Sequence, residues 1–299
     1  MIANPRWIGA GLVALSALSF GAMAIFARFA FAGGVDVTAL LFLRFLIAGA
    51  LMAVLMSALK RPWPRRRNTL TLALMGGVGY VAQALCFFLA LQHASAGLVA
   101  LLLYLYPFLV TLLGVAFAGE RLTLLRALAV LSALLGTALT IGAGISGSPL
   151  GIALGVAAAL IYSIYILVGN RVLKEEDPLA AAAVVMLAAA GVFGLVVLVD
   201  APRFPASAAA WAAVLAIALI STVVAMVGFF AGIKRLGAAD AATLSTLEPV
   251  VTFVLAAIFL DEPVSAAQLA GGSIVLGAVI ALARGQAGQG QGKGSTSSR

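Results

Sequence analysis

Charged residues are scarce in this sequence: they make up 9% of its 299 residues, whereas 64% of the residues are apolar. A soluble globular chain carries about 25% charged and about 45–50% apolar residues. No water-soluble fold can bury so much apolar surface, so the composition excludes that class of protein. Because one helix needs roughly 20 apolar residues to cross a bilayer, about ten crossings would use nearly the whole chain.

Residues that ligate metals or carry out redox chemistry are nearly absent. Cys86 is the single cysteine, which excludes an internal disulfide, and it lies in an apolar run where packing explains it. His93 is the single histidine and falls in a turn between predicted helices. The sequence has no HExxH motif and no Walker motif, so we expect no metal, no cofactor and no direct use of ATP.

Apolar runs separated by glycine, proline and charge predict ten transmembrane helices and almost no chain for a soluble domain. The predicted helices span residues 7–30, 36–59, 69–91, 95–118, 124–142, 149–169, 178–199, 208–232, 238–260 and 265–283. The remaining tail, residues 285–299, is rich in Gly, Gln and Ser and has no apolar face to bury. It is therefore predicted to be a disordered cytoplasmic tail.

Basic residues are distributed very unevenly between the two sides of the predicted helices. Fifteen Lys and Arg residues lie in the loops and termini of one side, and only Arg203 lies on the other. Since cytoplasmic loops retain positive charge during insertion, we expect both termini in the cytoplasm. The chain is then a multi-pass protein of the plasma membrane, the bacterial inner membrane. The net charge of +8 reflects this topology, and we expect the lipid bilayer, not nucleic acid, as its large partner.

The two halves of the sequence match when one is shifted by 142 positions. The shift pairs rarer residues without a gap: Phe87 with Phe229, Pro107 with Pro249, Phe117 with Phe259 and Glu120 with Glu262. Each half holds five predicted helices, and an odd number of crossings makes the second half enter the membrane from the opposite side. We therefore expect two inverted repeats, residues 1–142 and 143–284, with alternating access and a binding site between them.

Paired motifs occur at equivalent positions in the two halves: SAGLVALLLYLYPFLVTLLGVAFAGE at 95–120 and GAADAATLSTLEPVVTFVLAAIFLDE at 237–262. Both resemble the signatures of EamA-type carriers of the drug/metabolite transporter superfamily. Within it, the sequence is most similar to YddG-type exporters of aromatic amino acids. The resemblance implies an all-α membrane protein whose ten helices surround a central cavity, formed mainly by the first, third, fourth, sixth, eighth and ninth helices.

Polar and aromatic side chains within the predicted helices are the candidates to line this cavity, because polar groups are costly in lipid. On the third helix Gly76, Tyr80, Gln83 and Phe87 recur at helical spacing and so share one face. Helix packing would also explain that stripe, but the amide of Gln83 needs polar partners. The complete set of substrate-binding candidates is Ser16, Ser19, Phe20, Met23, Tyr80, Gln83, Tyr104, Tyr162, Tyr165, Ser245 and Glu248.

The tyrosines among these candidates have competing interpretations. Tyr rings near a helix end usually lie at the membrane interface, but Tyr162 and Tyr165 fall in the middle third of their helix, which favours the cavity. Tyr104 and Tyr106 cannot share one face of a continuous helix, and we expect Tyr104 to face the cavity.

Two prolines fall inside predicted helices at equivalent positions of the two halves. Transmembrane prolines often serve packing alone. Pro107 and Pro249, however, recur at the repeat interval, which favours a shared kink and a gating role.

Three charges fall inside predicted helices. Glu248, next to Pro249, is the deepest acid, and it either takes up a proton during transport or serves a structural contact at a helix break. Arg44 lies on the second helix, which the resemblance places outside the cavity, so we expect it to snorkel or to cap carbonyl groups. Arg28 is expected to do the same near the outer end of the first helix.

We predict a secondary transporter that exports a small neutral metabolite, an amino acid and by resemblance an aromatic one. The alternatives are a carrier of another metabolite or drug class of the same superfamily, an intramembrane enzyme, or a channel. A sugar-phosphate carrier would need several basic residues in the cavity. An intramembrane enzyme would need a nucleophile with a neighbouring base, and the predicted helices offer no such combination. A channel would instead call for oligomer symmetry and a filter sequence. The oligomeric state is left open.

Overall fold

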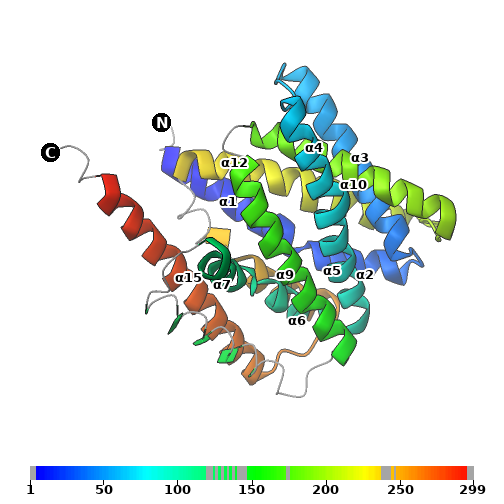
Figure 1. Ribbon diagram of the computed structural model, residues 1–299. Helices are drawn as coiled ribbons and strands as arrows, with labels where there is room; N and C mark the ends of the chain where they lie inside the picture. Colours follow the sequence, from blue (N-terminus) through cyan, green and yellow to red (C-terminus); the bar gives the residue numbers. More distant parts are fainter. Residues whose placement is uncertain are drawn as a thin grey trace.

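The computed structural model is built from helices that cross one another at varied angles (Figure 1). It describes residues 5–118, 147–172, 176–236 and 247–294, with residues 124, 127–128, 131–132, 135–136, 139 and 244–245 between them. Much of the predicted helix 124–142 and of the segment before Glu248 thus lies outside the described residues.

The helices of the first half follow the predicted spans but are interrupted in places. They are α1 (Pro5–Gly21), α2 (Met23–Ala32), α3 (Val37–Ala58), α4 (Arg66–Leu74), the π-helix η1 (Met75–Tyr80), α5 (Val81–His93), α6 (Ala96–Leu103) and α7 (Tyr106–Ala118). The second half has α9 (Pro149–Val172), α10 (Pro178–Asp200), α11 (Ala208–Ala218), the π-helix η2 (Leu219–Val224), α12 (Ala225–Leu236), α14 (Leu247–Phe259) and α15 (Ala266–Gly294).

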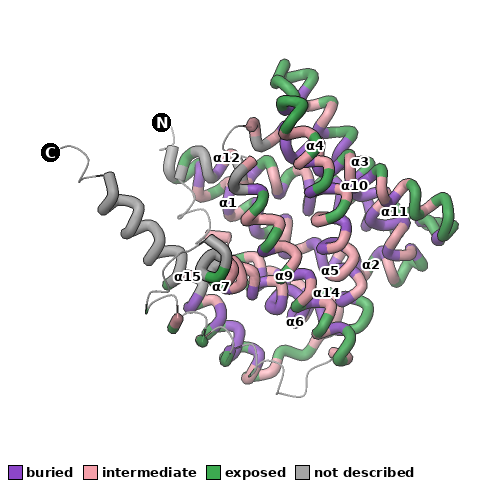
Figure 2. Tube along the Cα trace, viewed as in Figure 1, coloured by how far each residue is buried: buried purple, intermediate pink, exposed green. Residues whose placement is uncertain are grey.

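The described part of the chain contains six helical stretches that are long and apolar enough to cross a membrane. Exposed residues lie along the outer parts of the bundle (Figure 2). Many of the exposed side chains are large and apolar, for example Leu198 and Val199 of α10. Such a surface is stable in lipid and not in water. The protein is therefore a multi-pass membrane protein, and the total of ten helices stays a prediction.

Helix α15 differs from the prediction at its C-terminal end. The predicted helix ends at residue 283, whereas α15 runs to Gly294, so residues 285–294 of the tail that was predicted to be disordered are helical. Extending an existing helix by one residue costs far less than nucleating one, so a helix can outlast its apolar segment. Residues 295–299 lie outside the described residues.

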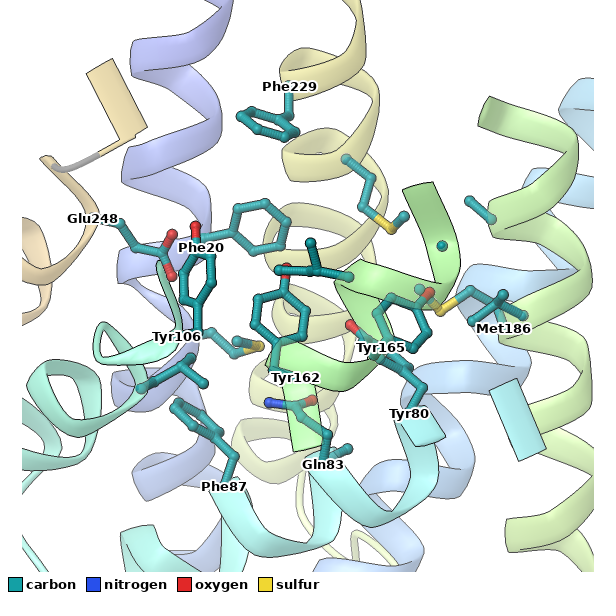
Figure 3. Close-up of a pocket in the computed structure, with 18 of the residues that line it drawn as sticks. Phe20, Tyr80, Gln83, Phe87, Tyr106, Tyr162, Tyr165, Met186, Phe229 and Glu248 are labelled. Carbon is teal, nitrogen blue, oxygen red and sulfur yellow. The ribbon is translucent and has the colours of Figure 1, made fainter. Parts of the chain in front are cut away.

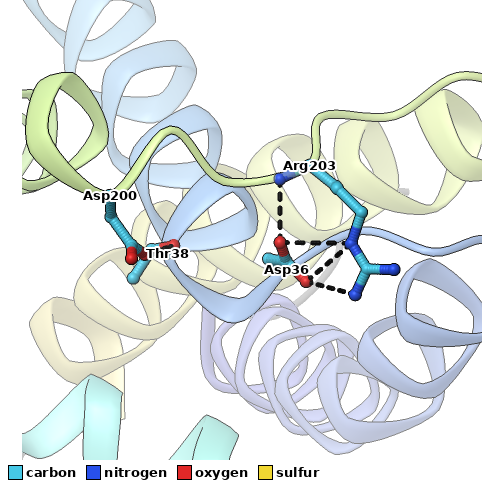
Figure 4. A network of polar contacts seen from close by, with 4 residues as sticks. All are labelled: Asp36, Thr38, Asp200 and Arg203. Atoms are coloured by element: carbon cyan, nitrogen blue, oxygen red, sulfur yellow. Dashed lines mark hydrogen bonds and ion pairs between the residues drawn. The ribbon is translucent and has the colours of Figure 1, made fainter.

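Helices α3 and α10 pack against each other in antiparallel orientation. At one end, the Asp36 carboxylate accepts hydrogen bonds from the backbone N–H and the guanidinium of Arg203, both at 2.8 Å (Figure 4). At the other end, Arg61 pairs with Asp177 at 2.6 Å. Asp177 follows Asp36 by 141 positions and Arg203 follows Arg61 by 142. An equivalent ion pair is thus formed twice with the two halves exchanged.

The third helix of each half is widened by a π-helical turn, η1 in the first half and η2 in the second. In η2 the Thr222 hydroxyl donates a hydrogen bond to the Ile217 carbonyl, five residues earlier, at 2.9 Å. A π turn shifts the register of the residues before it relative to those after it. Gly76 packs against the backbone of Val185 of α10, as the helix-packing interpretation of the stripe allows.

The two prolines assigned to gating stand close to the first residue of a described helix. Helix α6 ends at Leu103, and α7 begins at Tyr106 with Pro107 as its second residue. Pro249 is the third residue of α14. Proline supplies no N–H and is tolerated in the first turn, where that N–H has no partner within the helix. The predicted helix 95–118 is thus broken, not merely kinked.

Arg28 and Glu262 hold the ends of neighbouring helices. The Glu262 carboxylate accepts hydrogen bonds from the backbone N–H groups of Ala96 (2.9 Å) and Gly97 (3.4 Å), and so caps α6. Arg28 lies 3.7 Å from the same carboxylate and donates to the Ala94 carbonyl at 2.6 Å. Of the two roles expected for Arg28, the structure thus shows the capping of a carbonyl group, at the end of α5. Glu120, the repeat partner of Glu262, lies outside the described residues.

A cysteine at position 67, in a Cys86→Ala background, is expected to react with a membrane-impermeant maleimide only from the cytoplasmic side. Arg67 is exposed in the first turn of α4 and ends the basic segment 60–67, which the charge distribution assigns to the cytoplasm. Ala206→Cys, exposed on the opposite loop, is the control and should react only from outside. Labelling of position 67 from outside would reverse the orientation.

Candidate substrate cavity

The helices enclose a cavity of about 420 Å³ that receives side chains from both halves of the chain (Figure 3). Its walls come from α1, α2, α3, α4, η1, α5, α6, α7, α9, α10, α12 and α14, together with residues of the turns beside them. Most lining side chains are apolar or aromatic, and a few are polar or charged. This combination is typical of small-molecule sites.

Ten of the eleven predicted substrate-binding residues line this cavity. They are Ser16, Phe20, Met23, Tyr80, Gln83, Tyr104, Tyr162, Tyr165, Ser245 and Glu248. Ser19 is the exception: it is buried, and its hydroxyl donates to the Leu15 carbonyl at 2.7 Å. Ser16 and Phe20 are one helical turn apart and share the cavity face of α1, whereas Ser19 falls outside that face.

The cavity takes equivalent positions from the two halves. Shifting by 142 residues relates seven pairs of lining residues, namely Phe20 and Tyr162, Met23 and Tyr165, Arg44 and Met186, Ala84 and Met226, Phe87 and Phe229, Leu103 and Ser245, and Tyr106 and Glu248. Each charged member of these pairs, Arg44 and Glu248, has an uncharged partner. The charges therefore break the symmetry that the backbone repeat establishes.

All five tyrosines of the protein line the cavity and form one connected row of rings. Ring centroids are separated by 5.6 Å between Tyr80 and Tyr165, and by 6.1 Å between Tyr165 and Tyr162. The row continues from Tyr162 to Tyr106 at 5.0 Å and from Tyr106 to Tyr104 at 5.9 Å. These distances are typical of aromatic contacts, so the row offers an extended aromatic wall.

Tyr106 and Tyr104 both face the cavity, although a continuous helix would place them on different faces. The chain leaves α6 at Leu103, turns at Tyr104 and Leu105, and starts α7 at Tyr106. The turn removes the 100° rotation per residue that a continuous helix imposes. Both rings can then point inward, and the expectation that only Tyr104 does so is wrong.

Glu248 lies at one end of the tyrosine row. The Tyr104 hydroxyl lies 3.0 Å from a Glu248 carboxylate oxygen and 2.6 Å from the Ser245 carbonyl oxygen. Helix α14 approaches α1 closely here, because a Cβ atom on Gly21 would lie 2.8 Å from the Glu248 carbonyl oxygen. Because Gly21 has no side chain, the backbone of Glu248 can lie close to α1. The hydrogen bond from Tyr104 then orients the Glu248 side chain.

Arg44 lies at the other end of the row and is 2% exposed. Its Nε donates to the Thr222 hydroxyl at 3.0 Å, and its Nη2 to the Tyr80 hydroxyl at 3.4 Å. The guanidinium carbon also lies 5.1 Å from the ring centre of Phe45 and 5.4 Å from that of Phe88. The expectation that Arg44 snorkels outside the cavity is wrong, because α3 packs on the bundle interior with this side chain inward.

Sequence reasoning missed several lining residues besides Arg44. They include Met75, Tyr106, Phe88, Met186, Met226 and Phe229. A usable signal existed for Phe229, which the repeat pairs with Phe87. An arginine in an otherwise apolar span is also, by default, a functional candidate. In the described part of the chain, no group of three or more His, Cys, Asp or Glu residues is placed to hold a metal ion.

Truncating Tyr162 or Tyr165 to alanine is expected to lower transport of phenylalanine-sized substrates by roughly 3–10-fold, the value of one aromatic contact. Both rings line the cavity, so membrane expression should be unchanged. Ile164→Ala is the matched control, because Ile164 lies on the same helix and is 50% exposed on the outside. Initial rates in proteoliposomes provide the measurement, and normal kinetics in both Tyr variants would assign these rings to packing.

Comparison with known proteins identifies the repeat and its relatives. The family model described as the EamA-like transporter family matches residues 7–142 and again residues 149–284. The threonine/homoserine exporter RhtA of Escherichia coli K12 is 30% identical over 92% of this chain and 88% of its own length. The aromatic amino acid exporter YddG of Ancylobacter novellus is 27% identical over 78% of this chain and 81% of its own length.

A solved structure supports the same fold. One protein crystal structure superposes with a TM-score of 0.65 at 25% sequence identity, covering 92% of this chain and 97% of that chain. A further relative, a probable terminal-alkyne amino-acid exporter of Streptantibioticus cattleyicolor, is 26% identical over 84% of this chain and 85% of its own length.

Proposed function

This chain belongs to the EamA-like transporter family, and we propose that it exports amino acids, with a preference for aromatic side chains, by alternating access. The observation that carries the proposal is the composition of the cavity: an aromatic row with a guanidinium at one end and a carboxylate at the other. A zwitterion with an apolar side chain complements such a surface. Three of the relatives carry names that describe amino-acid exporters, one of them as probable, which supports the same class of substrate.

The size of the cavity is consistent with one small metabolite. Its volume of about 420 Å³ falls in the range of roughly 300–1,000 Å³ that is usual for ligand pockets. Five tyrosine rings supply apolar faces and hydroxyl groups, so an aromatic substrate would stack on the faces and leave its polar end to the charged residues. Stacking is the source of the preference that we propose.

Alternating access requires one part of the structure to stay fixed while another moves. Helices α3 and α10 are tied at both ends by equivalent ion pairs, and we assign the fixed role to them. The break between α6 and α7 and the start of α14 are the natural hinges, since Pro107 and Pro249 interrupt backbone hydrogen bonding there. In this proposal the two prolines act as gating elements of an inverted repeat.

Transport by the purified protein in liposomes tests the proposal directly. Radiolabelled phenylalanine, tryptophan, threonine and homoserine are offered one at a time, with empty liposomes as the control. We expect flux of all four, fastest for the aromatic pair. Faster flux of threonine and homoserine would assign the protein to the substrate class named for the E. coli relative. Absence of flux for every amino acid would overturn the proposed function.

A further inference from the structure

Arg44 is a buried cation for which the described residues provide no counter-ion. No Asp or Glu in the described part of the chain lies within ion-pair distance of its guanidinium, and Glu248 is engaged with Tyr104 at the other end of the tyrosine row. A guanidinium carries five N–H groups, and the hydrogen bonds to Thr222 and Tyr80 use two of them. An isolated buried charge is costly unless it is paired, so this position favours an anion.

The surroundings of Arg44 hold its guanidinium in a fixed place. Thr222 belongs to η2 and Tyr80 ends η1, so the side chain on α3 bridges the π-helical segments of both halves. Phe45 and Phe88 stack against the guanidinium carbon. A guanidinium held this way is preorganised, because little side-chain entropy is left to lose when a ligand binds.

We propose that Arg44 is the carboxylate-binding residue of the cavity. The substrate carboxylate would receive N–H groups of the planar guanidinium, with Tyr80 beside it, and the rest of the substrate would extend along the tyrosine row. A guanidinium matches the two oxygens of a carboxylate better than a point charge does. The proposal rests on the proposed function for the class of substrate, and it predicts a definite polarity: carboxylate at Arg44, ammonium toward Glu248.

The experiment compares phenylalanine with ligands that lack either its free carboxylate, which Arg44 would bind, or its ammonium group. Binding to the purified protein is measured by isothermal titration for L-phenylalanine, L-phenylalaninamide, phenethylamine and 3-phenylpropionate. With the wild type we expect the two ligands without a carboxylate to bind at least about ten-fold more weakly than phenylalanine, the usual value of a charge-assisted contact. In Arg44→Gln this discrimination should vanish, and in Arg44→Lys it should be partly retained.

A purely structural role for Arg44 predicts a different pattern. Arg44→Gln would then lower thermal stability and weaken all four ligands equally, leaving their ratios unchanged. If the Gln variant does not fold, the proposal is still tested by the ratio of the two dissociation constants that the wild type shows for phenylalanine and phenylalaninamide. Equal dissociation constants would overturn the proposal. The matched control is Ser57→Ala, at an exposed site on α3 away from the cavity, which should change neither binding nor the ratio.

The outcomes separate this proposal from the proposed function. Amino acids that are transported with no preference for a free carboxylate would overturn the role of Arg44 and leave the exporter function standing. Binding of 3-phenylpropionate that depends on Arg44, without transport of any amino acid, would support the carboxylate site and overturn the exporter function. Absence of binding by every carboxylate would overturn both.

Discussion

Replacing Glu248 by glutamine is expected to abolish the response of substrate flux to an imposed pH gradient while leaving exchange without a gradient intact. Glu248 is the one acidic residue among the cavity-lining side chains that the structure describes. Its repeat partner is Tyr106, so the titratable group is present in one half only. A carboxyl group whose hydration differs between inward-open and outward-open states binds a proton with different affinity in each, which is the minimum for coupling.

The measurement is flux of labelled phenylalanine in proteoliposomes with and without a pH gradient. Glutamine keeps the shape of the side chain and still accepts a hydrogen bond from Tyr104, but it does not titrate. Asp261→Asn is the control, since Asp261 is an exposed acid just beyond the end of α14. A wild type that ignores the gradient would make the protein a facilitator. A glutamine variant that fails to insert would assign Glu248 to structure.

Replacing Gly76 by alanine is expected to destabilise the protein by about 1–3 kcal/mol, the usual cost of overpacking a close contact. Gly76 stands in η1 against the backbone of α10, and an added Cβ would lie 2.8 Å from the Val185 Cα and closer still to its carbonyl oxygen. Backbone atoms cannot rotate away, so one helix must move. Transport should fall as well, because Val185 lines the cavity.

Thermal unfolding in detergent measures this effect. Gly191→Ala on α10 is a matched control, because an added Cβ there meets nothing within 4 Å. Alanine favours helix over glycine by up to about 1 kcal/mol, so the control should be as stable as the wild type or slightly more stable. An unchanged unfolding temperature for Gly76→Ala would show that η1 and α10 are farther apart than described.

Much of the membrane architecture could be predicted from composition and periodicity. The predicted spans 36–59 and 178–199 agree with α3 (Val37–Ala58) and α10 (Pro178–Asp200) to within one or two residues. Hydropathy is a local property, so it locates helix ends well wherever charge or proline follows an apolar run. The family could also be predicted from the sequence, because the motifs that carry the resemblance are contiguous segments of the chain.

The sequence by itself thus determined the membrane class, the duplicated halves and ten of the residues that line the cavity, because each follows from residue type and from regular helical spacing. The tertiary structure alone decided where that regularity fails. The break after Leu103 turns both Tyr104 and Tyr106 inward, and Gly76 of η1 packs against the backbone of α10. Arg44 received its place from the packing of α3 against η1 and η2. Contacts between segments distant in the chain select these local departures, and no local pattern records which distant segment will be the neighbour.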